Sequence, residues 1–309
     1  MYRYIIKRVL WLIPVLIGVS FVVFFLMDLA PGDVTSSFNT QDMTEEELYA
    51  LREEYGLNDS VFKRYVAYLG NFLKGDLGYS MVYKRPVAEV FFERFPATLE
   101  LALVGTLVAL IIAVPLGILA ARKRGTWIDG GSMVAALLGL SMPNFWVGLL
   151  LIILFSLNLG WLPSNGNETA ASIILPAITT GTGCAGTLCR MTRSSMLDVI
   201  RQDYLRTARA KGVSEKDVIR KHALRNALIP ILTVLGTVLG TAFGGAVLTE
   251  TVFAWPGVGR LMIKAINDRD AIMATGCIVL TTFFFTITLL LVDIIYAFVD
   301  PRIKAQYSK

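Results

Sequence analysis

The chain has 309 residues, of which 55% are hydrophobic and 17% are charged, and its formal net charge is +5. Soluble domains typically have about a quarter of their residues charged, and the charges of this chain lie between long apolar runs. These properties exclude an ordinary soluble protein and predict an all-α integral membrane protein that crosses the bilayer several times.

Six apolar segments approach the roughly 20 residues that a helix needs to cross the hydrocarbon core. They cover residues 9–29, 97–121, 133–157, 173–191, 229–248 and 271–298. Pro143 predicts a helix break within the third segment, and the run Thr179–Gly183 interrupts the fourth. We expect six transmembrane helices in one domain, residues 1–309, and the first is too long for a signal peptide.

The first two spans are separated by residues 30–96, which predict an external helical insertion. Thr44 and Glu47 have the spacing of a capping box, and Gly56 is a residue type that ends helices. The first helix of the insertion is therefore expected between these positions.

Two more helices are expected in this insertion. One extends from Val61 to Leu73, because apolar residues recur there at helical spacing. Its predicted apolar face consists of Phe62, Tyr65, Val66, Leu69 and Phe72. The other starts at Pro86 and ends before Pro96, since proline suits the first turn of a helix and disrupts its interior.

Lysine and arginine are distributed unevenly among the short loops. Segment 192–228 contains nine of them, whereas loop 158–172 contains none. Basic residues also precede the first span and follow the second and sixth. The positive-inside rule therefore predicts that both termini and segment 192–228 are cytoplasmic. Three basic residues after the fifth span depart from this trend.

Segment 192–228 predicts two helices joined at a glycine. An amphipathic helix is expected from Met196 to Lys211, and Gly212 is the expected stop residue. Ser214 and Asp217 predict the cap of the second helix. The buried side of the pair is expected to contain Met196, Val199, Ile200, Tyr204, Ala208, Val218, Ile219, Ala223 and Leu224.

Three interpretations of this segment compete. A helix-turn-helix DNA reader has a similar outline, but such modules rarely lie in a short loop between spans, so no nucleic acid is expected. A basic face beside anionic lipid explains the charges but not the glycine break and the two caps. Docking onto a soluble partner explains all three features.

The sequence of this segment supports the docking interpretation through a family resemblance. Residues 203–212 (DYLRTARAKG) and 222–230 (HALRNALIP) resemble the cytoplasmic EAA loop of ABC-importer permeases, in the branch that imports dipeptides, oligopeptides and nickel. Arg206-Thr207-Ala208 occupies the place of Glu-Ala-Ala in the general pattern, a departure that the peptide branch shares.

The resemblance extends over nearly the whole chain, through short motifs in the same order and spacing. These are residues 55–57, 75–80, 85–87, 96–101, 141–146, 175–177, 253–260 and 300–302. It implies a permease subunit in the cytoplasmic (inner) membrane of a prokaryote. The cargo implied is a short peptide; nickel or a nickel chelate is the alternative within the family.

The resemblance assigns two sets of candidate residues, and small and polar faces of the spans predict a third. The ATPase-coupling set is Asp203, Tyr204, Arg206, Ala208, Arg209, Ala210, Lys211, Gly212, Val213 and His222, with Tyr204, Val213 and His222 packed beneath the contact. The candidate pathway lining, on small and polar faces, is Thr179, Thr182, Gly183, Gly186, Gly240 and Gly244. The candidate docking surface for an external binding protein includes Trp255, Pro256 and Gly257.

The chain itself contains no recognisable ATP-binding or catalytic motif. It has no Gly-Lys dipeptide for a Walker A loop, and His222 is its one histidine. No metal site or cofactor is expected, and ATP and Mg²⁺ are assigned to partner chains. The expected partners are a second permease, two ATPases, an external binding protein and membrane lipid. A channel or secondary transporter without ATPases is the alternative from another class.

Overall fold

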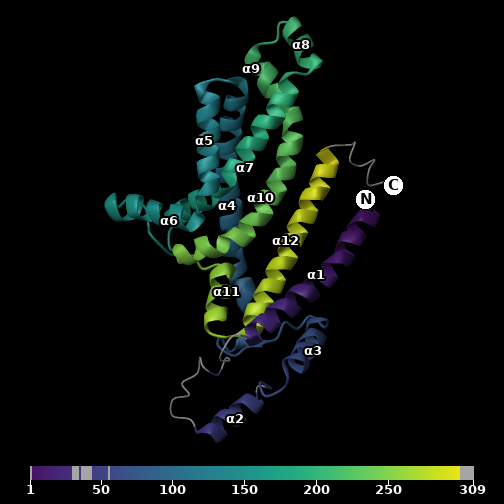
Figure 1. The fold of residues 1–309 in the computed structure, drawn as a ribbon, viewed down its shortest axis with the longest axis vertical. Helices are drawn as coiled ribbons and strands as arrows, with labels where there is room; N and C mark the ends of the chain where they lie inside the picture. Colours follow the sequence, from purple (N-terminus) through teal and green to yellow (C-terminus); the bar gives the residue numbers. More distant parts are fainter. Residues whose placement is uncertain (1, 30–34, 36–43, 55, 300–309) are drawn as a thin grey trace. The chain divides into compact units, whose positions relative to one another are not determined.

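The structure is a computed structural model that describes residues 2–29, 35, 44–54 and 56–299. Its described part consists of helices, the turns and loops that join them, and one pair of two-residue strands; Figure 1 shows the helices. The chain divides into two compact units. Unit 1 consists of Leu99–Trp255 with Ile287–Lys309, and unit 2 of Tyr2–Thr98 with Pro256–Thr286. Two of the boundaries fall within the long helices that contain Thr98 and Thr286, and the third falls between helices, at Trp255 and Pro256.

Unit 2 contains the insertion and the helices that frame it. Its elements are α1 (Tyr2–Leu29), α2 (Glu45–Glu54), α3 (Val61–Phe72), β1 (Tyr79–Ser80), β2 (Arg85–Pro86), the start of α4 (Val87–Arg122), α11 (Val258–Asn267) and the start of α12 (Ala271–Val299). Strands β1 and β2 pair antiparallel, with Tyr79 opposite Pro86. This small hairpin was not expected from the sequence.

The caps predicted for the insertion are confirmed. The Thr44 amide donates to Glu47 Oε2 at 2.8 Å, and the Glu47 amide donates to Thr44 Oγ1 at 3.3 Å. Gly56 has φ +65°, the left-handed conformation of a helix stop. Helix α3 has the predicted limits to within one residue.

Helix α3 packs on α1 through aromatic side chains. Tyr65 contacts Phe24 and Phe21, with ring centroids 5.6 and 5.3 Å apart, and its hydroxyl donates to the Ile17 carbonyl at 3.0 Å. The predicted apolar face was wrong in part. Phe62 and Val66 are exposed, and Tyr68 is buried instead, because the face turned toward α1 is shifted by about one side chain.

The predicted third helix of the insertion does not end before Pro96. It is the beginning of α4, which continues to Arg122 without interruption. Val90 and Phe91 before the proline, and Leu101 after it, are all buried. The burial on both sides outweighs the one hydrogen bond that proline cannot donate.

Unit 1 is built around α7. Its elements are the rest of α4, α5 (Trp127–Ser141), α6 (Asn144–Leu151), the π-helix η2 (Ile152–Asn158), the 3-10 helix η3 (Ala170–Ile173), α7 (Ile174–Ile200), α8 (Asp203–Ala210), α9 (Glu215–Asp217), the π-helix η4 (Val218–Ala223), α10 (Leu224–Val252) and the end of α12. Helix α7 contacts α5, α6 and α10.

The predicted break at Pro143 is confirmed, and it is larger than a kink. Helix α5 ends at Ser141, and the helix from Asn144 to Asn158 leaves at 100° to it, as Figure 1 shows. The sequence predicted one span over residues 133–157. The segment is instead bent at Pro143 and is not one straight span. Met142 and Pro143 are extended, and proline disfavours helical backbone in the residue before it.

The expected interruption of the fourth span is absent. Helix α7 continues through the Thr-Gly run because its hydroxyls bond within the helix: Thr179 Oγ1 donates to the Leu175 carbonyl at 2.8 Å, and Thr182 Oγ1 to the Thr179 carbonyl at 3.0 Å. The glycines allow close neighbours. A Cβ on Gly186 would lie 2.4 Å from the Ala136 carbonyl oxygen of α5.

Four helices among the described residues are long and apolar enough to cross a membrane, and six result if each of two bent pairs forms one span. The four are Val9–Leu29, Val87–Arg122, Ala170–Ile200 and Ala271–Val292. The bent pairs are Trp127–Ser141 with Asn144–Asn158, and Glu215–Leu228 with Pro230–Gly240, which bends by 56°. The count of six spans stays a prediction.

Candidate functional site

The segment that follows α7 differs from its prediction at one point. The single helix expected from Met196 to Lys211 is broken, since α7 ends at Ile200 and α8 begins at Asp203. Gln202 between them is extended, with φ −72° and ψ 144°. Asp203 then provides the acidic first turn that favours a new helix start.

The turn between α8 and α9 forms as predicted. Gly212 has φ +79°, and the Val213 amide donates to the Ala208 carbonyl at 3.3 Å. The Ser214 hydroxyl accepts from the Asp217 amide at 3.3 Å and caps α9. A side chain at position 212 would have space but would strain the backbone, since φ is positive.

The residues beneath this turn are partly those predicted. Fully or nearly fully buried there are Ala121, Met196, Leu205, Ala208, Val218, Ile219, Ala223 and Ala227, with Val213 partly buried against them. Tyr204 and His222 are exposed, so their predicted packing beneath the contact was wrong. Tyr204 instead accepts a hydrogen bond from the Asn226 side-chain amide at 2.7 Å. Leu205, which lies one position later in α8, fills the interior.

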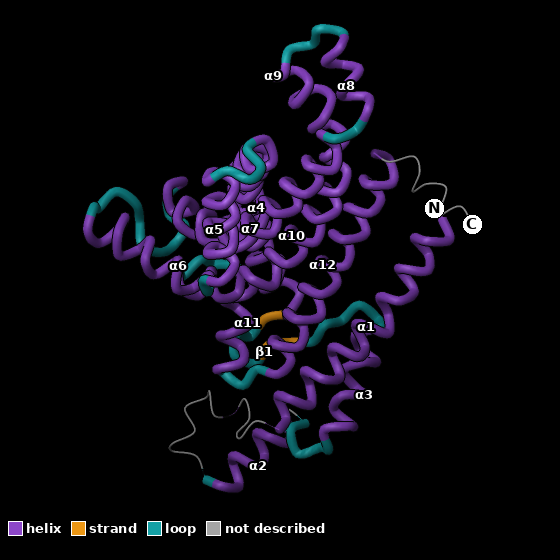
Figure 2. The backbone as a smooth tube through the Cα atoms, turned by 45° about the horizontal axis from the view of Figure 1, so that its top comes forward, coloured by secondary structure: helices purple, strands orange, loops and turns teal. Residues whose placement is uncertain are grey.

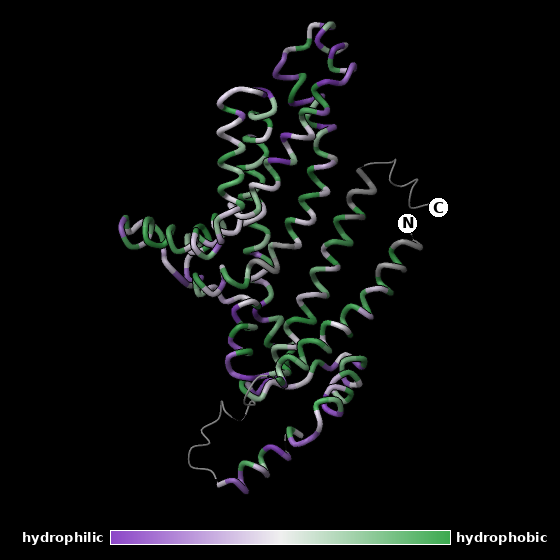
Figure 3. Tube along the Cα trace, viewed as in Figure 1, coloured by the Kyte–Doolittle hydropathy of each residue, from purple (hydrophilic) through white to green (hydrophobic). Residues whose placement is uncertain are grey.

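Helix α8 contains many hydrophilic residues, as Figure 3 shows, and most of them lie on its exposed side. Asp203, Arg206, Ala210 and Lys211 are exposed there. Arg209 differs from them because two of its nitrogens are engaged: Nε donates to Glu215 Oε2 at 2.9 Å and Nη2 to Oε1 at 3.0 Å. This two-bond pair closes the turn around Gly212.

The turn lies between two long helices in the chain. Chain continuity links α8 to α7 and η4 to α10, and Figure 2 shows α8 and α9 beyond the ends of these two helices. Arg193 of α7 donates to Asp129 of α5 from Nε at 2.6 Å and from Nη2 at 2.7 Å. Asp129 also accepts from the Gly125 amide at 3.0 Å. The Arg193–Asp129 pair therefore ties α7 to α5.

The sequence did not reveal the Asp129–Arg193 pair or the Arg209–Glu215 pair. Asp129 lies at the border of an apolar run, where a charged side chain needs a partner. The sequence does not identify Arg193 as that partner. Two ionisable residues lie within the apolar segments 97–121 and 271–298: Glu100 is exposed on α4, and the side chain of Asp293 lies outside the described part.

The candidate pathway residues lie mostly in helix contacts. Thr179 and Gly186 are buried against α6 and α5, and a Cβ on Gly183 would lie 2.2 Å from Asn144 Oδ1. Thr182 and Gly183 keep partial exposure, and Gly240 is buried in α10. The surroundings of Gly244 are outside the described residues. A pathway lining on this face stays a prediction.

The candidate docking residues are less accessible than expected. Trp255 is only 3% exposed, and its amide donates to the Glu250 carbonyl at 2.8 Å. Gly257 is buried at the N-cap of α11, and Pro256 is half-buried. Docking through these three residues stays a prediction, and the indole of Trp255 is a poor candidate for direct contact.

Residues 113–305 match the family described as "Binding-protein-dependent transport system inner membrane component", and residues 1–102 match the N-terminal family that accompanies it. The chain belongs to this family. It is accordingly a multi-pass membrane permease of the ABC importer type, which itself carries no catalytic centre.

Similar proteins support this membership over the full length. The oligopeptide transport system permease protein AppB of Bacillus subtilis is 42% identical, over 98% of this chain and 100% of that protein. The glutathione transport system permease protein GsiC of Escherichia coli O6:H1 is 41% identical, over 98% and 99%. An inward-facing structure of the MetNI methionine ABC transporter has a TM-score of 0.60 at 19% identity, over 68% of this chain and 96% of its own, and shares the fold.

Proposed function

We propose that the chain is one of two membrane-spanning subunits of an ABC importer that moves short peptides into the cytoplasm. The names of the two relatives, an oligopeptide and a glutathione permease, support a small peptide as the cargo. Two ATPases that bind ATP and Mg²⁺, a second permease and an external binding protein complete the proposed assembly. Both termini and the α8–α9 turn face the cytoplasm in this proposal.

The structure of the α8–α9 turn supports a role in coupling ATP hydrolysis to transport. Its exposed polar face belongs to a segment that is capped at Ser214, closed by the Arg209–Glu215 pair and filled beneath by Leu205. A stiff segment of this kind transmits the movement of an ATPase to α7 and α10. Arg206 and Lys211 are the proposed contacts with the ATPase, and Arg209 is a positioning residue.

The Gly212→Ala variant tests this role, with Gly166→Ala as its matched control. The two glycines have φ +79° and +78°, and neither has a neighbour within 4 Å of an added Cβ. Both substitutions therefore strain a turn equally. We expect Gly212→Ala to lower peptide-stimulated ATP hydrolysis by the purified assembly several-fold, and Gly166→Ala to leave it unchanged. Equal effects of both variants would contradict the coupling role.

Two further measurements test the assembly and the cargo. Gentle purification through a C-terminal tag, followed by mass spectrometry, should recover two ATPases and a second permease with this chain. Recovery of the chain alone would favour a channel or secondary transporter. Uptake of a radiolabelled tripeptide that a large excess of nickel fails to inhibit supports a peptide cargo, and the opposite result supports nickel.

A further inference from the structure

Unit 1 contains an open groove of about 750 Å³ between the end of α4 and the segment formed by α9, η4 and the start of α10. We call it the α4–η4 groove. An apolar cluster holds its two walls together, because Ala121 of α4 is buried with Val218 and Ala223 of η4. The groove is lined by Pro115, Ile118, Leu119, Arg122, Lys216, Ile219, Arg220 and Leu224.

The groove has a basic end and an apolar end. On α4 its basic residue is Arg122, the last residue of the helix, which lies close enough to Glu215 of α9 to act on that carboxylate electrostatically. On the opposite wall, Lys216 and Arg220 come before Leu224. Both walls therefore place their basic residues beside α9 and their apolar residues farther from it.

The three basic residues of the groove remain available to a ligand. All three are exposed, and within the part of the chain that the structure describes none of their side chains forms a hydrogen bond or an ion pair. No carboxylate lines the groove. The nearby carboxylates are engaged elsewhere, because Glu215 accepts two bonds from Arg209 and Asp217 pairs with Lys221 at 3.1 Å. The basic end therefore favours an anionic ligand.

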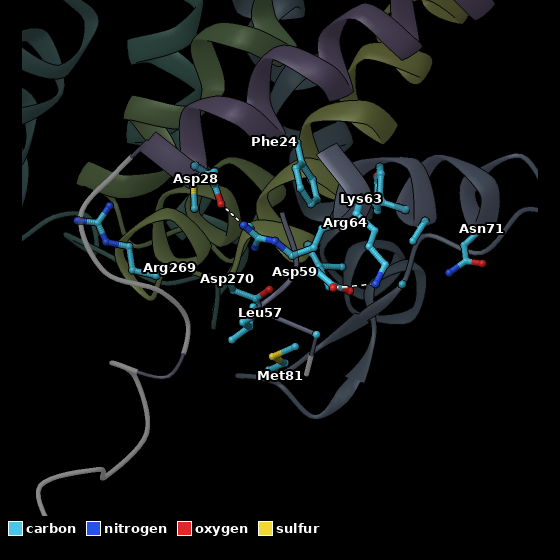
Figure 4. Close-up of a pocket in the computed structure, with 17 residues that line it drawn as sticks. Phe24, Asp28, Leu57, Asp59, Lys63, Arg64, Asn71, Met81, Arg269 and Asp270 are labelled. Atoms are coloured by element: carbon cyan, nitrogen blue, oxygen red, sulfur yellow. Dashed lines mark hydrogen bonds and ion pairs between the residues drawn. The ribbon is translucent and has the colours of Figure 1, made fainter. Parts of the chain in front are cut away.

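The largest cavity of unit 2 by comparison selects no ligand through its charges. Figure 4 shows that its cations and carboxylates lie together, with Arg64 paired to Asp28 and Lys63 to Asp59 as dashed lines. Because these charges are paired within the chain, they leave little for a bound molecule to satisfy. The α4–η4 groove has cations alone.

The apolar end of the groove belongs to a candidate span. Helix Val87–Arg122 is long and apolar enough to cross a membrane, and its apolar run ends at Ala121. Leu119 is 40% exposed, and Pro115 lies seven residues before Arg122, about 10 Å deeper along the helix axis. A soluble anion or a soluble protein does not cover residues at that depth, whereas an acyl chain does.

We propose that the α4–η4 groove binds one anionic phospholipid, with the chemistry of phosphatidylglycerol. Its phosphate oxygens accept from Arg122 and Arg220, Lys216 balances its charge, and an acyl chain lies along Pro115 and Leu119. Basic pockets between transmembrane helices are a known binding mode for anionic headgroups. The assignment of this lipid to the cytoplasmic leaflet rests on the proposed function, whereas the binding itself does not.

Lipid titration of the purified assembly in detergent, followed by native mass spectrometry, tests this proposal. Dioleoylphosphatidylglycerol should bind more tightly than dioleoylphosphatidylethanolamine, which has the same acyl chains and no net charge. Arg122→Gln and Arg220→Gln should each weaken phosphatidylglycerol binding about five-fold, the value of one basic residue beside an anionic lipid. Neither should lower the melting temperature, because both side chains are exposed.

Matched controls lie on α4 or directly after it. Arg124→Gln removes an exposed cation outside the groove and should bind phosphatidylglycerol like the wild type. Leu119→Trp should fill the groove and weaken binding several-fold. Leu107→Trp adds the same bulk at a 54% exposed position of α4 outside the groove, and it should have no effect.

Four outcomes would overturn the proposal. Phosphatidylethanolamine binding as tightly as phosphatidylglycerol would remove the argument from charge. Equal losses in Arg122→Gln and Arg124→Gln would show a general attraction to a basic surface. Unchanged binding in both Arg122→Gln and Arg220→Gln would place the lipid elsewhere. Displacement of the lipid by inorganic phosphate would assign the groove to a soluble anion.

Discussion

The two units hold their helices together by different means. In unit 1, α7 contacts its neighbours through residues with small side chains. A Cβ on Gly117 of α4 would lie 2.8 Å from the Cys189 carbonyl oxygen of α7. In unit 2, α4 and α12 meet through rings, with Phe91 and Phe284 stacked at a centroid distance of 6.1 Å. Where backbones are in contact, adding an atom to a side chain causes a clash. Where rings are packed, removing a ring leaves a cavity.

This difference shows where each unit is sensitive to substitution. Glycine contacts define helix separation directly, so α7 and α5 keep one spacing. Aromatic clusters fill space and can be repacked by other large apolar side chains.

Phe91→Ala should be the most destabilising change, at about 3–5 kcal/mol, because it opens a cavity in the buried cluster of unit 2. Phe91→Leu should cost about 1 kcal/mol, since most of the volume remains. Thermal unfolding of the purified protein in detergent measures both. Similar losses for the two variants would show that the ring itself, not its volume, is required.

Arg193→Gln should destabilise unit 1 by about 2–3 kcal/mol, because it leaves the buried Asp129 carboxylate without its cation. The estimate is reduced for the partial exposure of Arg193, which is 27%. The double variant Asp129→Asn/Arg193→Gln should recover part of the loss in the same thermal assay. A double variant less stable than the single one would refute the pairing argument.

Gly186→Ala should cost about 1–3 kcal/mol, because the new methyl group would overlap the Ala136 carbonyl oxygen and Leu140. Gly130→Ala in α5 is the control, since nothing lies within 4 Å of its Cβ. It should be neutral or slightly stabilising, because alanine favours helix. The melting temperatures of both variants in one detergent check the prediction.

Glu215→Gln should change stability by no more than about 0.5 kcal/mol, because the ion pair with Arg209 is half exposed and screened by salt. Its effect should appear in peptide-stimulated ATP hydrolysis, which we expect to fall because the turn loosens. Lys221→Gln, which breaks the exposed pair with Asp217, is the control. A large loss of stability in Glu215→Gln would contradict the surface assignment.

The smallest effect concerns pH and Asp270. Burial is the main cause that raises the pKa of this carboxyl, which accepts from Ser80 Oγ at 2.5 Å. Because the pKa of Asp270 is higher in the folded protein than its unfolded value of 3.8, its protonated form stabilises the fold. This stabilisation is complete below pH 3.8 and is lost as the pH rises through the folded pKa. Asp270→Asn should therefore flatten the decline in melting temperature between about pH 4 and neutral pH. An unchanged slope would exclude this group.

Periodicity and capping residues were sufficient to predict most of the fold. The limits of α3, the Thr44–Glu47 box and the Gly212 turn follow from local chemistry, which acts within a few residues. The continuation of α4 through Pro96 depends on burial by distant helices. Local sequence signals carry no information on such contacts.

The candidate site was predictable to a similar degree. The glycine turn and its cap were visible in the sequence, but the choice between Tyr204 and Leu205 as the buried residue was not. The break at Gln202 rotates α8 relative to α7, and one helical periodicity cannot be extended across such a break. Both ion pairs join residues whose proximity is produced only by the fold.

The composition of α7 has a consequence for how the chain enters the membrane. Its most apolar window has a mean hydropathy of only 1.3, and 61% of that window is buried within the chain. Helix α7 leaves the ribosome before α10, which packs on one side of it. The segment synthesised between them includes the whole α8–α9 turn. Until α10 is synthesised, the side of α7 that packs against it lacks that cover. Stable insertion of this helix therefore awaits a later one, and biogenesis is cooperative across the second half of the chain.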